Sequence, residues 1–230
     1  MKIKTRAIIK NIISSILVFA TIIASIFCLT AILFNITYTI APIKNYCMYP
    51  LINKYAPDEK TYSDYAYLNK FAEFKNNDIV IASPNWPLTD TSVIKRLIAS
   101  PGDTVEILET ETKFQLLVNN ELVYDKDKTT TNVHGGIGGT IGYYQNYLTL
   151  INSLSEKNIT ISKSGNKCIK LNDDEYFLMG DNWGESYDSI ENGFVKKSQI
   201  DGRVDFVIDV KENKKLEIFK EMCKALFCFK

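Results

Sequence analysis

The sequence predicts an all-β body that follows a single N-terminal transmembrane helix. Two observations lead to this fold class: a long apolar run without charges lies near the N-terminus, and many short β-type segments separated by turn residues follow it. The chain has 230 residues, which is enough for one sizeable domain, or for one domain that carries an insert.

The apolar run has the length and the flanks of a membrane anchor. The first ten residues carry four basic and no acidic side chains, and the next charged residue is Lys44. As a helix, the densely apolar residues 12–36 would extend about 37 Å, enough to cross a hydrocarbon core of about 30 Å. Such a run exceeds the apolar region of a cleaved signal peptide, and a soluble helix is rarely apolar on every face. We therefore predict a cytoplasmic stub over 1–10 and a transmembrane helix over 11–36.

Charge also predicts the orientation and limits the partners. The basic stub should lie in the cytoplasm, which places the chain from about residue 37 onward outside the cell membrane. The 27 basic and 27 acidic side chains of the chain cancel, so the residues after the stub carry a net charge of −4. This balance argues against a nucleic-acid binder, which normally has a basic excess. We expect a single-pass protein of the cell membrane that contacts the lipid bilayer and no nucleic acid.

One histidine and five cysteines limit the possible sites. His134 alone cannot form a zinc site with two or three imidazoles, and its glycine-rich surroundings lack the Gly-Lys-Ser/Thr ending of a phosphate-binding loop. Cys28 falls within the predicted span, and the other four cysteines follow it: Cys47, Cys168, Cys223 and Cys228. These four could form disulfides outside the cell, in pairings that the sequence leaves open. We expect no metal, nucleotide or organic cofactor.

Short strand-like segments recur through the body and end at turn residues such as Pro101-Gly102-Asp103. Pro42 makes the first of them an edge strand, and Asn119-Asn120 marks a hairpin turn. The expected strands are 38–44, 78–82, 92–98, 104–108, 114–118, 122–124, 159–162, 168–171, 176–179 and 203–210. We expect loops over the polar residues 53–77 and over 125–147, and an amphipathic helix over 211–230.

Three segments of the body combine into one pattern. They are Asn45-Tyr46-Cys47-Met48-Tyr49-Pro50, then Lys95-Arg96 followed by Pro101-Gly102-Asp103, and finally Gly180-Asp181-Asn182 followed by Ser186-Tyr187-Asp188-Ser189. In this order, behind an N-terminal anchor, they resemble the bacterial type I signal peptidases, which are membrane-anchored serine proteases with a Ser/Lys dyad. The likeness covers roughly residues 37–52, 78–103 and 176–204.

The resemblance implies a role for each polar residue of the pattern. Cys47 would be the nucleophile and Lys95 the general base. Four further residues would bind the oxyanion or support the dyad: Asn45, Asp181, Ser186 and Asp188. Of these, Ser186 would orient Lys95, Asp181 would hold the surrounding turns, and Asn45 would join the Cys47 backbone N–H at the oxyanion.

Three positions depart from the family pattern. Cys47 replaces the nucleophilic serine, and Trp183 replaces a common arginine. Ile190 stands where the family usually has arginine, which removes an expected ion-pair partner of Asp188. A free thiol has a pKa of about 8.5, below the value of about 10.4 of an ordinary lysine side chain. A buried pair of the two could therefore rest as thiolate and ammonium.

The implied function is that of a membrane-bound endopeptidase that removes signal peptides from exported preproteins at small-x-small sites. The preprotein would add as an extended strand beside Tyr38–Lys44 and Thr91–Ile94, and the export translocon is a further expected partner. We divide the chain beyond the membrane into a catalytic core over 37–103 and 176–210, a β-rich insert over 104–175 and an amphipathic tail over 211–230.

Two alternatives stay open. Cys47 and His134 could form a papain-like pair. The cysteine at the nucleophile position could instead mark a catalytically inactive relative, tethered to the membrane, that holds exported peptides in an extended groove. Replacement of Lys95 by alanine should abolish cleavage if the Cys/Lys dyad works, whereas replacement of His134 should not.

Overall fold

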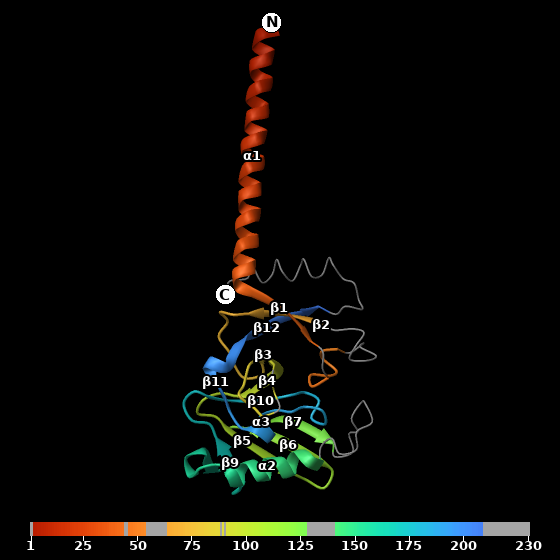
Figure 1. Ribbon diagram of the computed structural model, residues 1–230, viewed down its shortest axis with the longest axis vertical. Helices are drawn as coiled ribbons and strands as arrows, with labels where there is room; N and C mark the ends of the chain where they lie inside the picture. The colour runs from red at the N-terminus through yellow and green to blue at the C-terminus, as the bar shows by residue number, and fades with distance from the viewer. Residues whose placement is uncertain are drawn as a thin grey trace.

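In a computed structural model, the chain forms one long helix that projects from a β-rich body (Figure 1). The structure describes residues 2–43, 46–53, 64–87, 89, 91–127 and 141–208. The long helix α1 (Lys2–Thr37) is exposed over most of its length. Among the described residues it alone is long and apolar enough to cross a membrane, over Ile8–Thr37. The fold class predicted from the sequence, a β-rich body behind one apolar helix, is confirmed.

The first sheet begins directly at the end of α1, and seven strands of the described chain form it in antiparallel pairs. From one edge to the other these strands are β1 (Tyr38–Ile43), β2 (Asp64–Asn69), β12 (Ile200–Ile208), β3 (Ile79–Ala82), β4 (Val93–Ala99), β10 (Glu175–Met179) and β11 (Val195–Lys196). As predicted, the proline-containing β1 lies at an edge, where its missing N–H interrupts no ladder.

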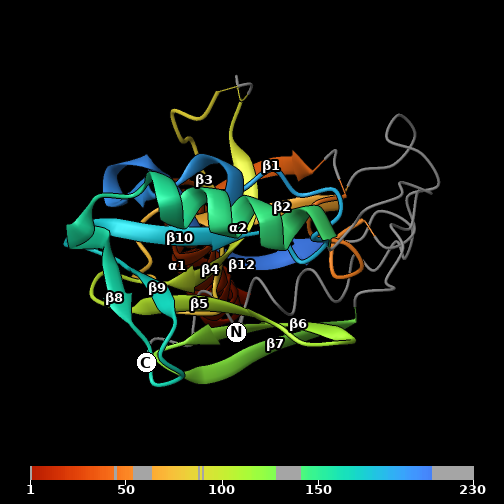
Figure 2. The same cartoon turned by 90° about the horizontal axis from the view of Figure 1, so that it is seen from below.

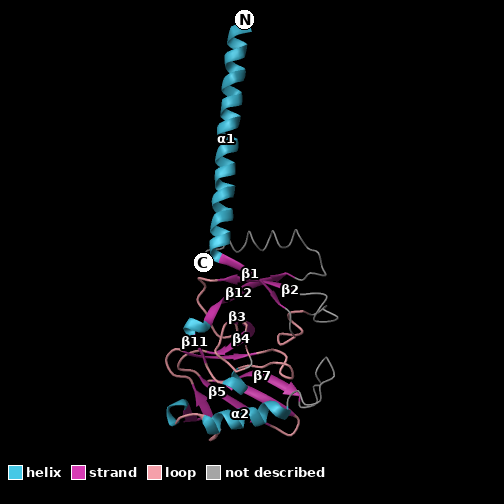
Figure 3. Cartoon of the chain, viewed as in Figure 1, coloured by secondary structure: helices cyan, strands magenta, loops and turns pink. Residues whose placement is uncertain are grey.

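The second sheet contains five strands of the described chain, again in antiparallel pairs. In spatial order they are β7 (Glu121–Asp127), β6 (Lys113–Val118), β5 (Thr104–Glu109), β9 (Lys167–Lys170) and β8 (Ile159–Ile161). The helix α2 (Ile141–Ser153) runs lengthwise across the body (Figure 2). Three one-turn helices complete the described part of the chain: η1 (Glu156–Asn158), α3 (Ser189–Asn192) and η2 (Lys197–Gln199). Figure 3 shows that strands and loops otherwise make up the body.

The expectation of a loop over 53–77 is wrong for β2. This strand lies inside the sheet between β1 and β12, and Ala66, Tyr67 and Leu68 are buried. Asp64 is buried as well, because its carboxylate and backbone exchange hydrogen bonds with Asn53. The polar and aromatic residues of the segment hide the apolar alternation by which strands are recognised in a sequence.

The expectation of a loop over 125–147 is wrong at its start, where β7 continues to Asp127, and at its end, where α2 begins at Ile141. Tyr143, Tyr147, Leu150 and Ile151 recur at helical spacing and are buried against the second sheet. The aromatic members of this face were not recognised as core residues in a polar sequence. His134 and the expected helix over 211–230 lie outside the described residues.

The strand β4 runs through all three buried clusters of the body. Ile94 joins a cluster with Cys47, Leu97 joins a second cluster with Leu178, and Ile98 joins the cluster under α2. A strand buried on both faces has little freedom to shift in register. The polar side chain of Lys95, in the middle of β4, is therefore held at a defined place inside the protein.

Candidate active site

The turn that follows β1 brings Cys47 against β4. Its backbone closes through a hydrogen bond from the Tyr49 N–H to the Tyr46 carbonyl, at 3.0 Å. Met48 and Ile52 are fully buried and anchor the turn in the body. The Cys47 thiol is 3% exposed and donates to the Ile94 carbonyl at 3.2 Å. Two residues that are 47 positions apart in the chain therefore meet at the site.

The Gly-Asp-Asn segment holds this turn in place from the other side. The backbone N–H of Asn182 donates to the Cys47 carbonyl at 2.9 Å, and the Asn182 side-chain amide donates to the Tyr46 carbonyl at 3.1 Å. Both bonds fix the main chain of the cysteine rather than its side chain. Asn182 was part of the sequence pattern, but its role could not be deduced from the sequence.

The base side of the site starts at Lys95, which is 3% exposed. Its Nζ donates to the Ser186 Oγ at 3.0 Å. The same hydroxyl accepts from the Gly180 N–H at 3.1 Å and donates to the Asp188 Oδ2 at 2.6 Å. A hydroxyl has one donor and two acceptor lone pairs, so all three are used and the Ser186 side chain has a single orientation.

Close approach of three segments requires a residue without a side chain at Gly180. A Cβ at this position would lie 2.5 Å from the Cys47 carbonyl oxygen and still closer to the Ser186 Oγ. A Cβ essentially never lies this close to another heavy atom, so any side chain would push the cysteine turn away from Ser186. The glycine of the Gly-Asp-Asn segment is thus explained by packing between the two sides of the site.

Asp188 is fully buried and serves as the N-cap of α3. Its carboxylate accepts from the backbone N–H groups of Gly180 at 3.0 Å and Ile190 at 3.1 Å, from the Ser186 hydroxyl, and from the Tyr143 hydroxyl. Neutral donors therefore satisfy this carboxylate where Ile190 replaces the expected arginine. Tyr143 was missed in the sequence, since nothing near it in the chain points to Asp188.

Asp181 holds β4 to the Gly-Asp-Asn turn. It accepts two parallel hydrogen bonds from the Arg96 guanidinium, at 2.7 and 2.5 Å, and the Tyr124 hydroxyl lies 3.5 Å from its Oδ1. Arg96 also donates to the Asn77 carbonyl at 3.0 Å. Since Arg96 is the neighbour of Lys95, this bidentate pair fixes the strand that carries the lysine.

Burial raises the pKa of the Cys47 thiol above its usual range. The Lys95 ammonium, within hydrogen-bonding reach, lowers this pKa through its charge, but the cost of burying a thiolate is the larger effect. The cost of burial thus opposes formation of a thiolate at Cys47, and with it the thiolate–ammonium pair expected from ordinary pKa values.

A groove of about 340 Å³ lies between β1 and the start of β4. One wall is the edge strand β1 with Ala41, Pro42 and Ile43, and the other wall consists of Thr91, Ser92, Val93 and Ile94. Ile94 is the residue whose carbonyl accepts from the Cys47 thiol. Ile94 therefore links the lining of the groove to the candidate nucleophile.

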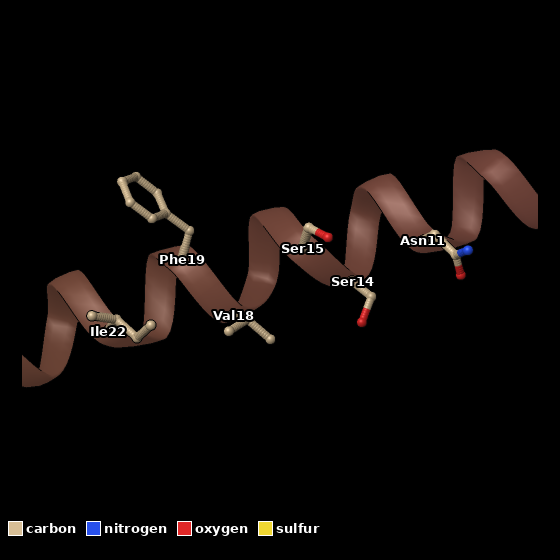
Figure 4. Close-up of a pocket in the computed structure, with 6 residues that line it drawn as sticks. All are labelled: Asn11, Ser14, Ser15, Val18, Phe19 and Ile22. Atoms are coloured by element: carbon tan, nitrogen blue, oxygen red, sulfur yellow. The ribbon is translucent and has the colours of Figure 1, made fainter.

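A second groove, of about 460 Å³, lies on α1 and is lined by Asn11, Ser14, Ser15, Val18, Phe19 and Ile22 (Figure 4). Its lining side chains come from one helix, and none of them titrates, so it is no candidate for the chemistry of the site. In the described part of the chain, no group of three or more histidine, cysteine, aspartate or glutamate side chains could hold a metal ion.

The structure brings Cys47, Lys95, Ser186, Asp181 and Asp188 into one region. Asn45 and His134 lie outside the described residues, so their predicted roles are not tested by the structure. The side chains of Arg96, Asn182 and Tyr143 complete the region without having been assigned a role in advance.

Comparison with known proteins gives two sequence matches and one match to a solved structure. A family model described as signal peptidase, peptidase S26, matches residues 8–208. Signal peptidase I P of Bacillus subtilis subsp. natto is 32% identical over 151 residues, which cover 63% of this chain and 67% of that protein. The crystal structure of a signal peptidase I from Enterococcus faecalis, 20% identical, covers 58% of this chain and 97% of its own, with a TM-score of 0.34.

Proposed function

The chain belongs to the signal peptidase family, peptidase family S26, and from this premise we propose that Cys47 and Lys95 form the dyad with which it cleaves signal peptides from exported preproteins. The observation that carries the proposal is the continuous chain of contacts from Cys47 to Lys95 and on to Ser186 and Asp188. Nucleophile, base and base-orienting groups are thus in the order that acyl transfer requires.

The first half of the reaction transfers the acyl group to sulfur. The reaction starts from the form of the enzyme in which Lys95 is neutral. As the peptide fills the groove, the proton of the Cys47 thiol moves to the lone pair of the neutral Lys95 Nζ, and the sulfur attacks the scissile carbonyl. The C–N bond then breaks, and the Lys95 ammonium gives the proton to the leaving amine. A thioester on Cys47 and a free amino terminus of the mature protein result.

The second half returns the enzyme to its resting state. Lys95, again neutral, takes a proton from a water molecule, and the resulting hydroxide attacks the thioester. The C–S bond breaks, the signal peptide leaves with a new carboxyl group, and the proton on Lys95 returns to the sulfur. Throughout, Ser186 holds the Nζ through the hydrogen bond of 3.0 Å.

Negative charge develops on the carbonyl oxygen in both halves. We assign its stabilisation to the backbone N–H of Cys47 and to the side chain of Asn45, two residues before it. The two bonds from Asn182 to the carbonyls of Cys47 and Tyr46 support this assignment, because they hold the main chain of the turn that would present the N–H.

The groove supports an extended peptide as the substrate. The edge of β1 can add a further strand, and the opposite wall at 91–94 can pair with its other side. Apolar lining side chains such as Ile43 and Val93 favour small apolar residues near the cut, as in small-x-small sites. The groove begins only four residues after α1 ends at Thr37, which suits a preprotein held in the same membrane.

The family and the apolar helix indicate a membrane-anchored protein. We propose that the N-terminus is cytoplasmic and that the body is extracytoplasmic, since the basic residues crowd at the start of α1. In this orientation the groove faces signal peptides after export, and the translocon that delivers them is the proposed neighbour.

A second candidate function is a membrane-tethered peptide-binding protein without activity. The raised pKa of Cys47 favours it, because a thiol that stays protonated is a poor nucleophile. The two functions share the groove and differ in whether the sulfur forms a bond to the peptide.

Cleavage of a synthetic preprotein peptide by the full chain in detergent tests the proposal. We expect cleavage after a small-x-small site, loss of cleavage in Cys47→Ala, and loss after treatment with a thiol alkylator. His134→Ala should cleave like the unaltered chain, and a loss there would favour the papain-like pair instead. Binding of the peptide without cleavage, together with cleavage by Cys47→Ser, would establish the inactive relative.

A further inference from the structure

We propose that Tyr143, from helix α2, is a positioning residue that holds the Asp188 carboxylate and, through it, the Ser186–Lys95 pair. The inference rests on the proposed function, since it concerns the orientation of the proposed base. It gives the insert over 104–175, which contains α2, a role at the candidate active site.

Tyr143 and Ser186 donate to the same oxygen atom. The Asp188 Oδ2 accepts from both hydroxyls and from the Gly180 N–H, whereas the Oδ1 accepts from the Ile190 N–H. Only two hydrogen bonds and one carboxylate oxygen therefore separate the Tyr143 phenol from the hydroxyl that binds the Lys95 Nζ.

The carboxylate needs this donor because it is fully buried. Among the described residues, the donors to its two oxygens are two backbone N–H groups and two hydroxyls, none of which is charged. An ionised buried carboxylate that lacks a cation must be satisfied by several neutral donors. Loss of one of four would leave more negative charge at the oxygen that faces Ser186.

The ring of Tyr143 is fixed independently of its hydroxyl. It is 4% exposed and stacks on Trp183, with ring centroids 5.1 Å apart and an interplanar angle of 14°. One turn along α2, the Asn146 side-chain amide donates to the Glu191 Oε1 at 3.0 Å. The stacking on Trp183 and the bond from Asn146 to α3 therefore both hold α2 in place, and with it the phenol beside the carboxylate.

This arrangement predicts how the hydroxyl acts on the nucleophile. The charge of Asp188 raises the pKa of the Cys47 thiol, and a hydrogen bond to that carboxylate offsets part of its charge. In Tyr143→Phe the ring keeps its stacking while the carboxylate loses one donor. Formation of the Cys47 thiolate should therefore require a higher pH than in the unaltered chain.

The rate of alkylation of Cys47 by iodoacetamide tests the inference, because it needs no peptide substrate. The full chain in detergent is treated between pH 6 and 10, and mass spectrometry of the Cys47 peptide separates it from the other cysteines. We expect the alkylation profile of Tyr143→Phe to shift to higher pH. Its kcat for peptide cleavage should fall about tenfold, with little change in KM. The double variant Tyr143→Phe/Ser186→Ala should then be no slower than Ser186→Ala alone.

Tyr147→Phe is the matched control. Tyr147 lies one turn further along α2, is equally buried, and donates to the Val105 carbonyl at 3.3 Å instead of to the site. An unshifted alkylation profile in Tyr143→Phe, or the same shift in both variants, would overturn the inference. If the unaltered chain fails to cleave the peptide, the proposed function falls, whereas the alkylation profiles still decide the role of Tyr143.

Discussion

The nucleophile side and the base side of the candidate active site differ in chemical character. On the nucleophile side, which comprises Cys47 and its turn, the thiol belongs to an apolar cluster that also contains Ile43, Met48, Ile52, Ala66, Leu68, Ile81 and Ile94. On the base side, Lys95 begins a line of hydrogen bonds through Ser186 to Asp188 and Tyr143. One side is therefore mainly apolar, and the other holds charged and hydrogen-bonding side chains in fixed places.

This difference bears on how the proposed dyad would be activated. Burial on the apolar side raises the pKa of the Cys47 thiol and so opposes formation of a thiolate. In the proposed mechanism Lys95 accepts the proton, and the hydrogen bonds of Ser186 hold its Nζ in place. Changes to Lys95 should thus have large effects on the rate of cleavage. Changes at the margin of the base side, at the Arg96–Asp181 pair and at Glu191, should mainly alter the stability of the fold.

Removal of the base should have the largest effect. Lys95→Met keeps an unbranched side chain among buried neighbours but provides no proton acceptor, so we expect a loss of roughly 10³-fold in kcat for peptide cleavage, the size of a general-base contribution. Steady-state kinetics measure this loss. Lys113→Met is the control, since Lys113 pairs with Asp125 at the surface of the second sheet. Cleavage by Lys95→Met at a rate close to that of the control would show that another group is the base.

A side chain at Gly180 should force the two sides apart. The Cβ of Gly180→Ala would collide with the Cys47 carbonyl and with Ser186, and we expect the unfolding free energy to fall by about 3 kcal/mol, as in other overpacked sites. Thermal and denaturant unfolding measure the change. Gly142→Ala, whose Cβ would meet nothing within 4 Å at the start of α2, should be neutral or slightly stabilising. Equal stability of the two variants would contradict the close approach.

The same contrast explains how far the sequence could lead. The strands β3, β4 and β10 were predicted because alternating or continuous apolar residues mark them locally. Lys95 and Ser186 were predicted as partners from the resemblance of their segments to a known family. The contacts of Asn182 with the cysteine turn and of Tyr143 with Asp188 join positions 136 and 45 residues apart. No local sequence pattern encodes such contacts. The helix α2 itself was not predicted, because its buried face is largely aromatic.

At the margin of the base side, the Arg96–Asp181 pair should contribute mainly to stability. Arg96→Lys keeps the charge but cannot form both parallel hydrogen bonds. Because the two side chains are 12% and 14% exposed, we expect a loss of about 1–2 kcal/mol in the unfolding free energy. Arg203→Lys affects the more exposed pair with Asp205 and should cost less than about 1 kcal/mol. The prediction fails if Arg203→Lys proves the more damaging of the two in chemical denaturation.

The smallest effect should be on the pH dependence of stability, through Glu191, which lies close to Asp188. Burial and the charge of Asp188 raise the pKa of Glu191 from 4.5 to about 7. In this window the folded chain holds a proton that the unfolded chain has released, so stability should fall as the pH rises from about 4.5 to 7. Glu191→Gln keeps an acceptor for Asn146 but does not titrate, and its thermal midpoint should fall less over the same window. Parallel curves for the two proteins would contradict the assignment.

In the proposed mechanism the sulfur of Cys47 forms a bond to the peptide with the help of Lys95. Rapid acid quenching of the full chain with a preprotein peptide, followed by mass spectrometry, would detect that bond. We predict a thioester on Cys47 with the mass of the N-terminal peptide fragment, released by hydroxylamine and lost in Lys95→Met. Cleavage without this adduct, at an undiminished rate in Cys47→Ala, would contradict the mechanism.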